Sequence, residues 1–549
     1  MKYYKYVACL MFLGVLASCK EDFLDRPPLD TMVDANFYRT ADQVLAGTAP
    51  LYNLVWFAYN DKASHGIGDG RGGVLFSGSY QRENIQMNTT GTTPENGAAW
   101  RSFYNIVGQT NTLIGNINRY VPASVPENIR NHAIGEARFM RGLAYSYLVQ
   151  NWGPVPIITD NTTLLTDTTI ARNTVESVWE FVIRDLRYAS KVLPTTPIQR
   201  GRLTKWSAEG MLAKMFLTRA GVGMSGTRRQ TDLDSAAYYA KRVIDNSGAT
   251  LMPNYAELFR TQNNNNPETL FALQWIYNGT WGTQNSVQAF LAFDATLTGF
   301  GDGWGGDIGA SHHMLMQYED LHQGTRRKAS FMLPGDRYSY IHQMLPDPAN
   351  PAARVPVLLH VKTDNNGQAA TRSRAHVKKY VVGPPISNNG TVLQQRTEIQ
   401  TYMLRLADVY LVYAEAVLGN SASTSNALAL QYFNAVRARA GLTTPKTSIT
   451  WEDIHKERMV EFAMEGQAWY EFVRLSYYKP QEAYTRLSNQ ERGNFTITPN
   501  NKDNATEWTF NIVTSAKYPV NEANFRIPIP ASELSGAPNL TKTPVPYQF

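Results

Sequence analysis

AIGEARFMRGLAYSYLVQNWGPVPII, residues 133–158, is the stretch of sequence that decides the fold. Small and apolar residues recur in it at spacings of three and four, which places them on one stripe of a helix; they are Ala133, Ala137, Met140, Ala144, Tyr147 and Leu148. Phe139 and Leu143 widen this stripe, so we expect the helix to be packed on more than one side. Gly153 and Pro154 end it, because glycine relaxes a helix C-terminus and proline cannot continue the helix.

The segment from Glu136 to Ile158 strongly resembles the signature helix of the SusD/RagB family. These are surface lipoproteins of Gram-negative bacteria that capture nutrients for a SusC-like TonB-dependent transporter. Four more blocks resemble the family in the same order, at residues 402–416, 433–442, 454–475 and 525–540, with Thr543 in place of an expected Asn. The resemblance implies a mainly α fold, in which a tetratricopeptide-like helix-pair scaffold carries an irregular, loop-rich lobe with short strands.

The N-terminus reads as a lipoprotein leader. Lys2 and Lys5 precede an apolar run at residues 7–16, which has the length of a signal-peptide core and is too short to span a bilayer. Residues 16–19, Leu-Ala-Ser-Cys, resemble a bacterial lipobox, so we expect residues 1–18 to be the signal peptide and Cys19 the lipidated N-terminus. Lys20-Glu21-Asp22 resembles a surface-export signal, which implies an outer-membrane, lipid-anchored protein facing the cell exterior. The alternative is an ordinary secretory signal with a chance cysteine.

The amino-acid composition limits which classes of ligand and cofactor this protein is expected to bind. Charged residues make up 18% of the 549, aromatics reach 11%, and the formal net charge is only +6 without a long Lys/Arg run, which makes nucleic acid a poor partner. The only cysteines, Cys9 and Cys19, lie near the leader, so the body has no internal disulfide and no cysteine for zinc. Thirty Tyr and eleven Trp suit a surface that binds polar, uncharged ligands. We expect no cofactor.

Helical periodicity appears in two blocks. The predicted helices are 40–59, 98–120, 128–151, 175–193, 205–220, 233–246, 402–418, 425–440 and 451–475. Pairs of about 34 residues suggest tetratricopeptide-like units. Between residues 251 and 400, and again between 489 and 549, glycine, asparagine and aromatics replace this periodicity, with one strand-like run at 269–277. We therefore expect residues 19–549 to form a single domain, with the scaffold mainly at 40–250 and 400–480 and the irregular lobe in the other two tracts.

Clusters of ionisable residues offer little catalytic chemistry. Glu457, Glu461 and Glu465 share one helical face and could form a metal or acid–base site, but a salt-bridge row is favoured; its partners would be Arg437, Arg439, Arg458 or Arg474. The pair His312-His313 lacks a metal-binding spacing. A glycosidase would need two carboxylates across a cleft, for which Asp302 and Asp307 are candidates only by proximity.

Two glycine-rich loops, residues 68–73 and 301–306, match G-x-G-x-x-G but do not lie in a βαβ unit. Their glycines suggest a flexible backbone that presents one large side chain, Trp304 in the second loop, and Trp281 has a similar setting. Aromatic faces stack on the apolar faces of sugar rings. We expect a glycan platform of Trp281 and Trp304, extended by Tyr80, with hydrogen bonds from the side chains Asp302, Arg71 and Gln81. The alternative is that these aromatics pin loops to the body.

The favoured function is non-catalytic, cell-surface binding of a polysaccharide or oligosaccharide, for delivery to a SusC-like transporter. Within the family, the well-spaced tryptophans resemble the platforms of members that bind linear plant β-glucans, such as xyloglucan or mixed-linkage glucan. Two alternatives stay open: RagB-like capture of peptides, and a surface-anchored glycoside hydrolase. The second is disfavoured because no convincing catalytic pair and no GxSxG elbow is present.

Overall fold

The computed structural model describes residues 34–549 apart from 166, 168, 323–324 and 363–373. The expected signal peptide, Cys19 and most of the N-terminal arm lie outside the described residues. The described chain begins with a short helix, α2 (Asp34–Phe37). Within the described part, no helix combines the length and the apolar character needed to cross a membrane.

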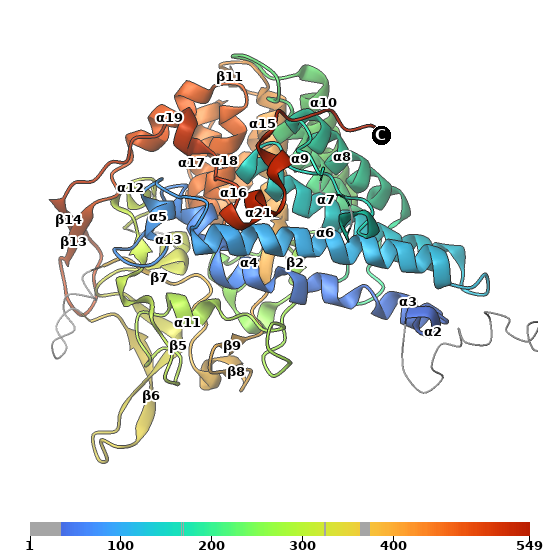
Figure 1. Ribbon diagram of the computed structural model, residues 1–549. Helices are drawn as coiled ribbons and strands as arrows, with labels where there is room; N and C mark the ends of the chain where they lie inside the picture. Colours follow the sequence, from blue (N-terminus) through green and yellow to red (C-terminus); the bar gives the residue numbers. More distant parts are fainter. Residues whose placement is uncertain (1–33, 166, 168, 323–324, 363–373) are drawn as a thin grey trace, which may run out of the picture.

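A scaffold of helices that pack side by side forms the upper part of the molecule (Figure 1). Its first series is α6 (Pro94–Tyr120), α7 (Glu127–Trp152), α8 (Val175–Val192), α9 (Lys205–Arg219) and α10 (Gln230–Asn246). The chain then leaves the scaffold and returns at α15 (Leu406–Leu418), which packs on α10, and continues through α16 (Ala427–Arg439), α17 (Trp451–Glu461), α18 (Ala468–Ser476) and α19 (Pro480–Ser488). The predicted mainly α, helix-pair class is confirmed.

Helix α7 is the centre of this scaffold, as its sequence predicts. It contacts both α6 and α8, and nearly every residue of its C-terminal two thirds is buried. Gly142 lets α8 approach: a Cβ there would lie 3.3 Å from the carbonyl oxygen of Val182 and 3.3 Å from Cβ of Asp185. Arg141 pairs with Asp185 at 2.8 Å across the same contact. The helix ends at Trp152, where Gly153 has a φ of +76°.

The lower part of the molecule is an irregular lobe with short strands (Figure 1). One sheet has four strands in the order β1 (Leu75–Phe76), β3 (Gly309–Ala310), β7 (His376–Val377), β4 (Phe331–Met332). Antiparallel pairs make up the rest: β2 (Thr269–Leu273) with β10 (Thr401–Arg405), β5 (Arg337–Pro346) with β6 (Arg354–His360), β8 (Val392–Leu393) with β9 (Arg396–Thr397), β11 (Ser423–Thr424) with β12 (Ile449–Thr450), and β13 (Asn494–Pro499) with β14 (Trp508–Thr514).

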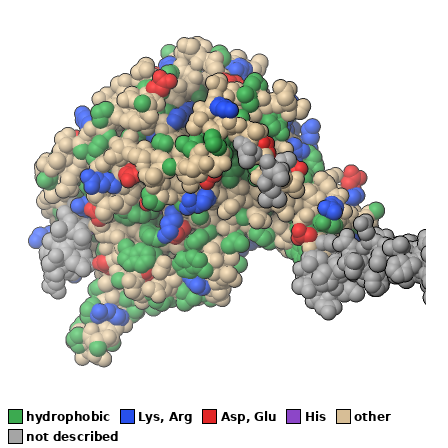
Figure 2. Space-filling view, viewed as in Figure 1, with side chains coloured by type: hydrophobic (Ala, Val, Ile, Leu, Met, Phe, Trp, Pro, Cys, Tyr) green, Lys and Arg blue, Asp and Glu red, His purple; other side chains and the backbone are tan. Residues whose placement is uncertain are grey.

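Short helices complete the lobe and the chain ends. They are α5 (Arg82–Ile85), α11 (Val287–Leu291), α12 (His312–Leu315), α13 (Thr325–Ser330), α20 (Glu522–Phe525) and α21 (Ala531–Gly536), with 3-10 turns η5 (Thr162–Leu165), η6 (Tyr255–Phe259), η7 (Thr261–Asn263), η8 (Gly305–Asp307), η9 (Pro385–Asn388) and η10 (Pro538–Thr541). On the face shown in Figure 2, hydrophobic side chains are visible over the lower lobe, in the region where Figure 1 places α11 and the β8–β9 hairpin.

Three predicted helices are wrong in part. The helix at 40–59 is split into α3 (Ala41–Ala46), η2 (Ala49–Tyr52), η3 (Leu54–Trp56) and α4 (Phe57–Lys62), and Pro50 at the start of η2 lacks the N–H that a continuous helix needs. Residues 402–405 belong to strand β10, because they pair with β2. The long helix at 451–475 is broken between α17 and α18, where Met464 and Gly466 have φ values of +62° and +68°.

The predicted start of the helix at 40–59 is nevertheless correct. Thr40 is the N-cap of α3, as expected: its hydroxyl accepts the N–H of Gln43, and the Gln43 side chain accepts the N–H of Thr40. The strand-like run at 269–277 is likewise present, although its regular part stops at Leu273.

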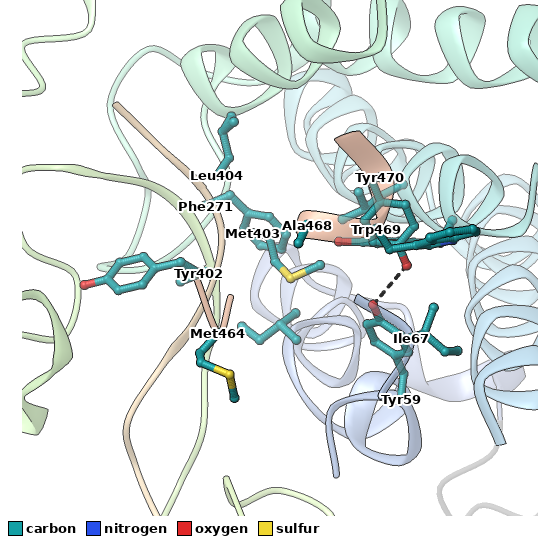
Figure 3. Close-up of a cluster of buried hydrophobic side chains, with 14 of the residues drawn as sticks. Tyr59, Ile67, Phe271, Tyr402, Met403, Leu404, Met464, Ala468, Trp469 and Tyr470 are labelled. Carbon is teal, nitrogen blue, oxygen red and sulfur yellow. Dashed lines mark hydrogen bonds between the residues drawn. The ribbon is translucent and has the colours of Figure 1, made fainter. Parts of the chain in front are cut away.

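The hydrophobic core joins the two ends of the chain (Figure 3). Tyr59 and Ile67 from the N-terminal region are buried in one cluster with Met403, Met464 and Trp469. The π-helix η4 (His65–Gly70) makes this possible, because a Cβ at Gly68 would lie 2.3 Å from the carbonyl oxygen of Gly466. The glycines of the first G-x-G-x-x-G loop therefore serve backbone packing inside the molecule.

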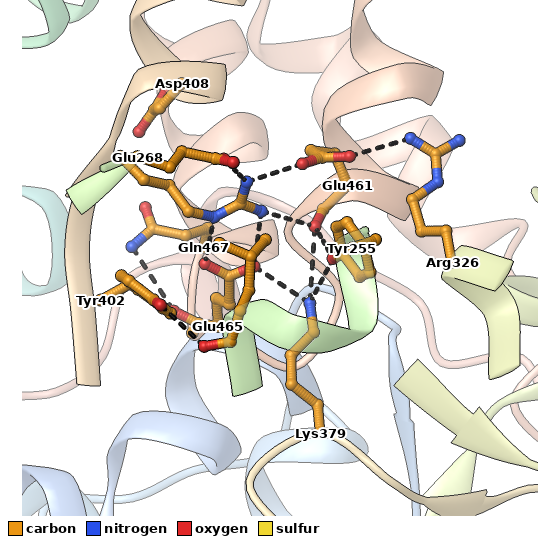
Figure 4. A network of polar contacts seen from close by, with 12 residues as sticks. Tyr255, Glu268, Arg326, Lys379, Tyr402, Asp408, Glu461, Glu465 and Gln467 are labelled. Carbon is orange, nitrogen blue, oxygen red and sulfur yellow. Dashed lines mark hydrogen bonds and ion pairs between the residues drawn. The ribbon is translucent and has the colours of Figure 1, made fainter. Parts of the chain in front are cut away.

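A buried ionic network lies between the lobe and helix α17 (Figure 4). Arg405 pairs with Glu268 at 2.8 Å, with Glu461 at 2.6 Å and with Glu465 at 2.8 Å, and all four side chains are buried. Lys379 adds a contact of 3.0 Å to Glu465. The predicted salt-bridge reading of the glutamate row is confirmed, although Glu465 lies beyond the end of α17.

The arginine partners differ in part from those expected. Arg437 pairs with Glu457 at 3.4 Å, and Arg439 pairs with Glu461. Arg458 and Arg474 instead contact Glu471, in a neighbouring buried group. Burial alone would raise the pKa of Glu461, but the arginines 439, 405 and 326 outweigh it and lower that pKa to about 2.

Candidate functional site

Trp281 lies on a turn that the rest of the lobe holds in place. Its side chain is 51% exposed. On one side, its ring meets Phe57 edge-on, with 5.7 Å between ring centroids. The N–H of Ile276 donates to the carbonyl of Thr283 at 2.8 Å, which closes the turn. A large aromatic side chain is therefore presented to solvent from an ordered backbone.

Trp304 is also exposed to solvent from a well-packed loop, but glycine contacts hold this loop in place. Its side chain is 50% exposed, and its N–H donates to the carbonyl of Ala289 in α11 at 2.8 Å. Gly303 has a φ of +115°, and a Cβ there would lie 2.5 Å from the carbonyl oxygen of Asp294. A Cβ on Gly305 would likewise lie 2.4 Å from the carbonyl oxygen of Leu291. The glycines around Trp304 therefore hold the backbone closely against α11, and the predicted flexible presentation is replaced by a packed one.

Helix α4 connects the two tryptophans. Phe57 at its start contacts Trp281, and Lys62 at its end places its ammonium group 4.6 Å from the ring centroid of Phe290. Phe290 meets Trp304 edge-on at 5.3 Å. Because six residues of α-helix span about 9 Å, the two tryptophans belong to one continuous surface of modest length.

Tyr80 joins this surface through Phe290. The two rings are stacked, with centroids 6.2 Å apart and an angle of 25° between planes. Tyr80 is half-buried, and burial raises the pKa of its hydroxyl. The expectation that Tyr80 lies beside the tryptophans therefore fits the geometry, through a phenylalanine that the sequence did not single out. We call Trp281, Trp304, Tyr80, Phe57 and Phe290 the aromatic platform.

The structure does not bring Arg71 and Gln81 to the platform surface as hydrogen-bond donors. Arg71 is fully buried over the Trp469 ring, donates to the carbonyl of Phe525 at 2.8 Å, and has its pKa lowered to about 9 by burial. Gln81 is 5% exposed, and its side-chain amide donates to the carbonyl of Lys62 at 2.5 Å. Both side chains brace the inside of the molecule, which does not suit the expected role of contacting a ligand.

Asp302 and Asp307 lie near Trp304 but are both engaged within the chain. Asp302 is 2% exposed, and its Oδ2 accepts the N–H of Gln395 at 2.7 Å. Asp307 accepts hydrogen bonds from Ser77 and pairs with Arg374 at 3.1 Å. Burial would raise the pKa of Asp307, but these hydrogen bonds and the guanidinium lower it. Neither carboxyl is therefore a candidate general acid.

The paired histidines stand apart from this surface. His312 packs edge-on against Phe495 with centroids 5.5 Å apart, and burial lowers the pKa of His313 to about 4. Within the described ranges, no group of three or more His, Cys, Asp or Glu side chains could hold a metal ion.

The sequence alone did not single out Phe57 and Phe290 of the aromatic platform, nor Gln394 and Arg396, which lie beside it. The last two belong to the β8–β9 hairpin, which lies between the tryptophan loops. Phe57 lies in a predicted helix and Phe290 in the irregular tract, and nothing local in the sequence separates a core aromatic from one at the surface. Their roles depend on contacts between segments more than 200 residues apart.

The structure combines a helix-pair scaffold with an exposed aromatic platform, and comparison with known proteins places this fold in a family. The SusD family model matches residues 225–545, and a model described as starch-binding and associating with the outer membrane matches residues 22–217. A SusD-like protein of Bacteroides ovatus is 38% identical, over 97% of this chain and 96% of its own length. The chain belongs to the SusD family.

Solved structures agree with this assignment. One, determined with a xylogluco-oligosaccharide, is 36% identical, has a TM-score of 0.81, and is matched over 92% of this chain and 99% of its own. A laminarin-binding SusD-like protein has a TM-score of 0.64 at 21% identity, over 91% of this chain and 98% of its own, and supports the fold alone.

Proposed function

We propose that this protein binds a linear plant β-glucan, such as xyloglucan or mixed-linkage glucan, on the aromatic platform. The observation that carries the proposal is the pair of half-exposed tryptophans, Trp281 and Trp304, held on ordered loops of one surface. Exposed tryptophans are costly to leave in water, and a sugar ring offers an apolar C–H face that covers them. Phe290 between them supports both the Tyr80 and the Trp304 ring.

The relatives support the same ligand class. The 36% identical structure was determined with a xylogluco-oligosaccharide, and the match extends over almost the whole of both chains. A platform of flat side chains suits an extended, β-linked backbone, because successive sugar faces present themselves along a nearly straight line.

The proposed role is binding without hydrolysis. A glycosidase needs a general acid with a raised pKa opposite a second carboxylate. The two carboxyls beside the platform, Asp302 and Asp307, are bound within the chain, and the pKa of Asp307 is lowered. This arrangement favours a binding protein over a hydrolase.

The proposal extends to delivery of the glycan to a SusC-like TonB-dependent transporter, from an outer-membrane position facing the cell exterior. The leader carries a lipobox-like sequence that ends at Cys19, and the N-terminal family model is described as associating with the outer membrane. A diacylated cysteine supplies stable anchoring without a spanning helix.

The test is isothermal calorimetry with xylogluco-oligosaccharides, mixed-linkage glucan, laminarin and a peptide mixture. The proteins are wild type, Trp281→Ala, Trp304→Ala and the double variant. Stacking on an aromatic ring is worth about 1–3 kcal/mol, so each single variant should bind its β-glucan roughly ten- to a hundredfold more weakly.

The matched control is Tyr238→Ala, which removes an aromatic side chain that is 57% exposed on α10, away from the platform. It should bind like wild type. Peptide binding without glycan binding would favour the RagB-like alternative, and release of reducing ends from the glucan would favour a hydrolase. Unchanged affinity of the double variant would move the site elsewhere.

A further inference from the structure

The β8–β9 hairpin lies between the two tryptophan loops and bonds to both. The N–H of Gln395 at its tip donates to Oδ2 of Asp302, two residues before Trp304, at 2.7 Å. Arg396 donates from Nη1 to the carbonyl of Gly279, two residues before Trp281, at 3.0 Å. One six-residue hairpin thus sets the position of one tryptophan relative to the other.

The base of the β8–β9 hairpin is also held by hydrogen bonds. Thr397 and Asn285 exchange two backbone hydrogen bonds, at 3.0 and 2.9 Å, which joins β9 to the segment that follows the Trp281 turn. At the tip, Gln395 has a φ of +53°, a left-handed conformation that non-glycine residues adopt at a cost. The bond from the buried Asp302 carboxylate compensates that cost and holds the turn in one shape.

Two polar side chains of this hairpin stay available at the surface. Gln394 is exposed, and its amide forms no hydrogen bond with any residue that the structure describes. Its Nε2 would lie 3.8 Å from a Cβ built on Gly301, which places it beside the Trp304 loop. Arg396 is half-buried with its guanidinium carbon 5.7 Å from the centroid of the Trp281 ring, and it has no carboxylate partner within the described part of the chain.

These two groups match what sugar hydroxyls need. A carboxamide offers two N–H donors and a carbonyl acceptor, and a guanidinium offers five donors, whereas each hydroxyl both donates and accepts. Stacking on tryptophan alone discriminates poorly between sugars, because every pyranose has an apolar face. The groups that select a ligand must therefore be polar and must lie between the stacking surfaces.

We infer that Gln394 and Arg396 are the residues that hydrogen-bond the glycan between Trp281 and Trp304, so that the β8–β9 hairpin determines which glycan the platform accepts. This rests on the proposed function and deepens it, since it assigns hydrogen bonding to side chains that the sequence did not single out. Asp302 does not contact the glycan itself; it is a positioning residue that holds the hairpin tip. The selected ligand is a neutral β-glucan whose hydroxyls face the hairpin while its ring faces cover the tryptophans.

The experiment compares Gln394→Ala, Arg396→Ala and Arg396→Lys with wild type and Trp281→Ala, by calorimetry with xylogluco-oligosaccharide and with a cello-oligosaccharide of equal backbone length. The two alanine variants should each weaken binding about three- to tenfold, the factor expected for one or two net hydrogen bonds. They should also change the ratio of the two affinities. Arg396→Lys keeps the charge but loses the planar fork, so it should recover only part of the affinity.

Leu393→Ala is the matched control, because Leu393 is 41% exposed on the same hairpin and has no polar group to offer. It should leave both affinities unchanged. Asp302→Asn tests the positioning role: it should weaken binding with a normal melting curve, and the Gln394→Ala substitution should have less effect in its background.

The failures are distinguishable. If neither wild type nor Trp281→Ala binds any of the glycans, the proposed function is wrong, and this inference is wrong with it. If Trp281→Ala loses binding while Gln394→Ala and Arg396→Ala keep both wild-type affinities and their ratio, the platform stands and the inference about the hairpin is overturned. A melting temperature equal to that of wild type in each variant excludes unfolding as the cause of a loss.

Discussion

The hydroxyl of Tyr59 lies 3.3 Å from the hydroxyl of Tyr470, although 411 residues separate them in the chain (Figure 3). Both rings are buried, and the hydroxyl of Tyr470 also accepts a hydrogen bond from the side-chain amide of Asn151 at 3.2 Å. Helix α4, which supports the aromatic platform, is therefore fastened to α18 and to the end of α7.

Tyr59→Phe removes one hydroxyl from this contact without changing the packed volume. We expect the free energy of unfolding to fall by about 1 kcal/mol, the usual net worth of one buried hydrogen bond. The measurement is chemical denaturation of wild type and variant, with Tyr238→Phe at the exposed position on α10 as the control. A variant as stable as wild type would show that this contact contributes nothing.

Gly142→Leu should lower the melting temperature clearly. A side chain at this position has no room between α7 and α8, where even a Cβ would lie 3.3 Å from a carbonyl oxygen. Gly115→Ala on α6 is the opposite case, because nothing lies within 4 Å of a Cβ there. That change should stabilise the helix, by up to about 1 kcal/mol. Differential scanning calorimetry compares them, and equal shifts of both variants would contradict the prediction.

Gly303→Ala should impair the glycan site while leaving the fold intact. The backbone there has a φ of +115°, and the new Cβ would clash with the main chain of Asp294 at 2.5 Å, so the Trp304 loop must move away from α11. We expect at least about a tenfold loss of affinity in calorimetry. Gly115→Ala on α6, where nothing lies within 4 Å of a Cβ, should bind normally. Normal binding by Gly303→Ala would mean that the platform tolerates displacement of Trp304.

Acid should destabilise the protein from about pH 4.5 downward. The pKa values of Glu461 and Glu471 are lowered to about 2 in the fold, because the surrounding arginines outweigh the effect of burial. In the unfolded chain these carboxyls bind protons near pH 4.5, well before the folded protein does, so protonation favours unfolding as the pH falls. The stabilisation is complete above pH 4.5 and is lost toward pH 2.

Melting temperatures between pH 7 and pH 2.5 check this prediction. The control is the exposed Glu522, whose Gln variant should follow the wild-type profile closely. A melting temperature that stays level down to pH 3 would show that the network holds no pH-dependent stability.

Cys19→Ala should move the protein from the membrane fraction to the soluble fraction. The change removes the only cysteine that follows the apolar leader at a small-residue cleavage site. Detergent-phase separation of cell extracts is the measurement. The control is Cys9→Ala, which removes the other cysteine from within the apolar leader and should partition like wild type. An unchanged partition of Cys19→Ala would refute lipidation at this residue.

Much of the scaffold could be predicted from the sequence, because its signals are local. Each of these signals is contained in a few neighbouring residues: the stripe of small residues in α7, the helix end at Gly153-Pro154 and the N-cap at Thr40. The errors arose where distant segments override local preference. Tyr402 looks helical in sequence but pairs with β2, and Gly466 breaks a helix so that it can pack on Gly68.

The candidate site likewise has residues that could be predicted from the sequence and residues that could not. Trp281 and Trp304 could be predicted as exposed because glycines surround them in sequence. Arg71 and Gln81 lie in or near a glycine-rich loop that the sequence predicts to be exposed, but in the fold both side chains are buried. Gln394 and Arg396 could not be found this way, because only the folded hairpin brings residues near 395 beside residues near 280 and 302.

The contact between the backbone at Gly68 and Gly466 has a consequence for biosynthesis. When the first 400 residues have been synthesised, the backbone at Gly466 that packs on η4 is still missing, so the buried cluster around Ile67 lacks Met464 and Trp469. The N-terminal helices cannot reach their final arrangement until α18 has emerged. The packing of η4 and α4 is therefore among the last parts of the fold to be completed, after the ribosome has passed residue 476.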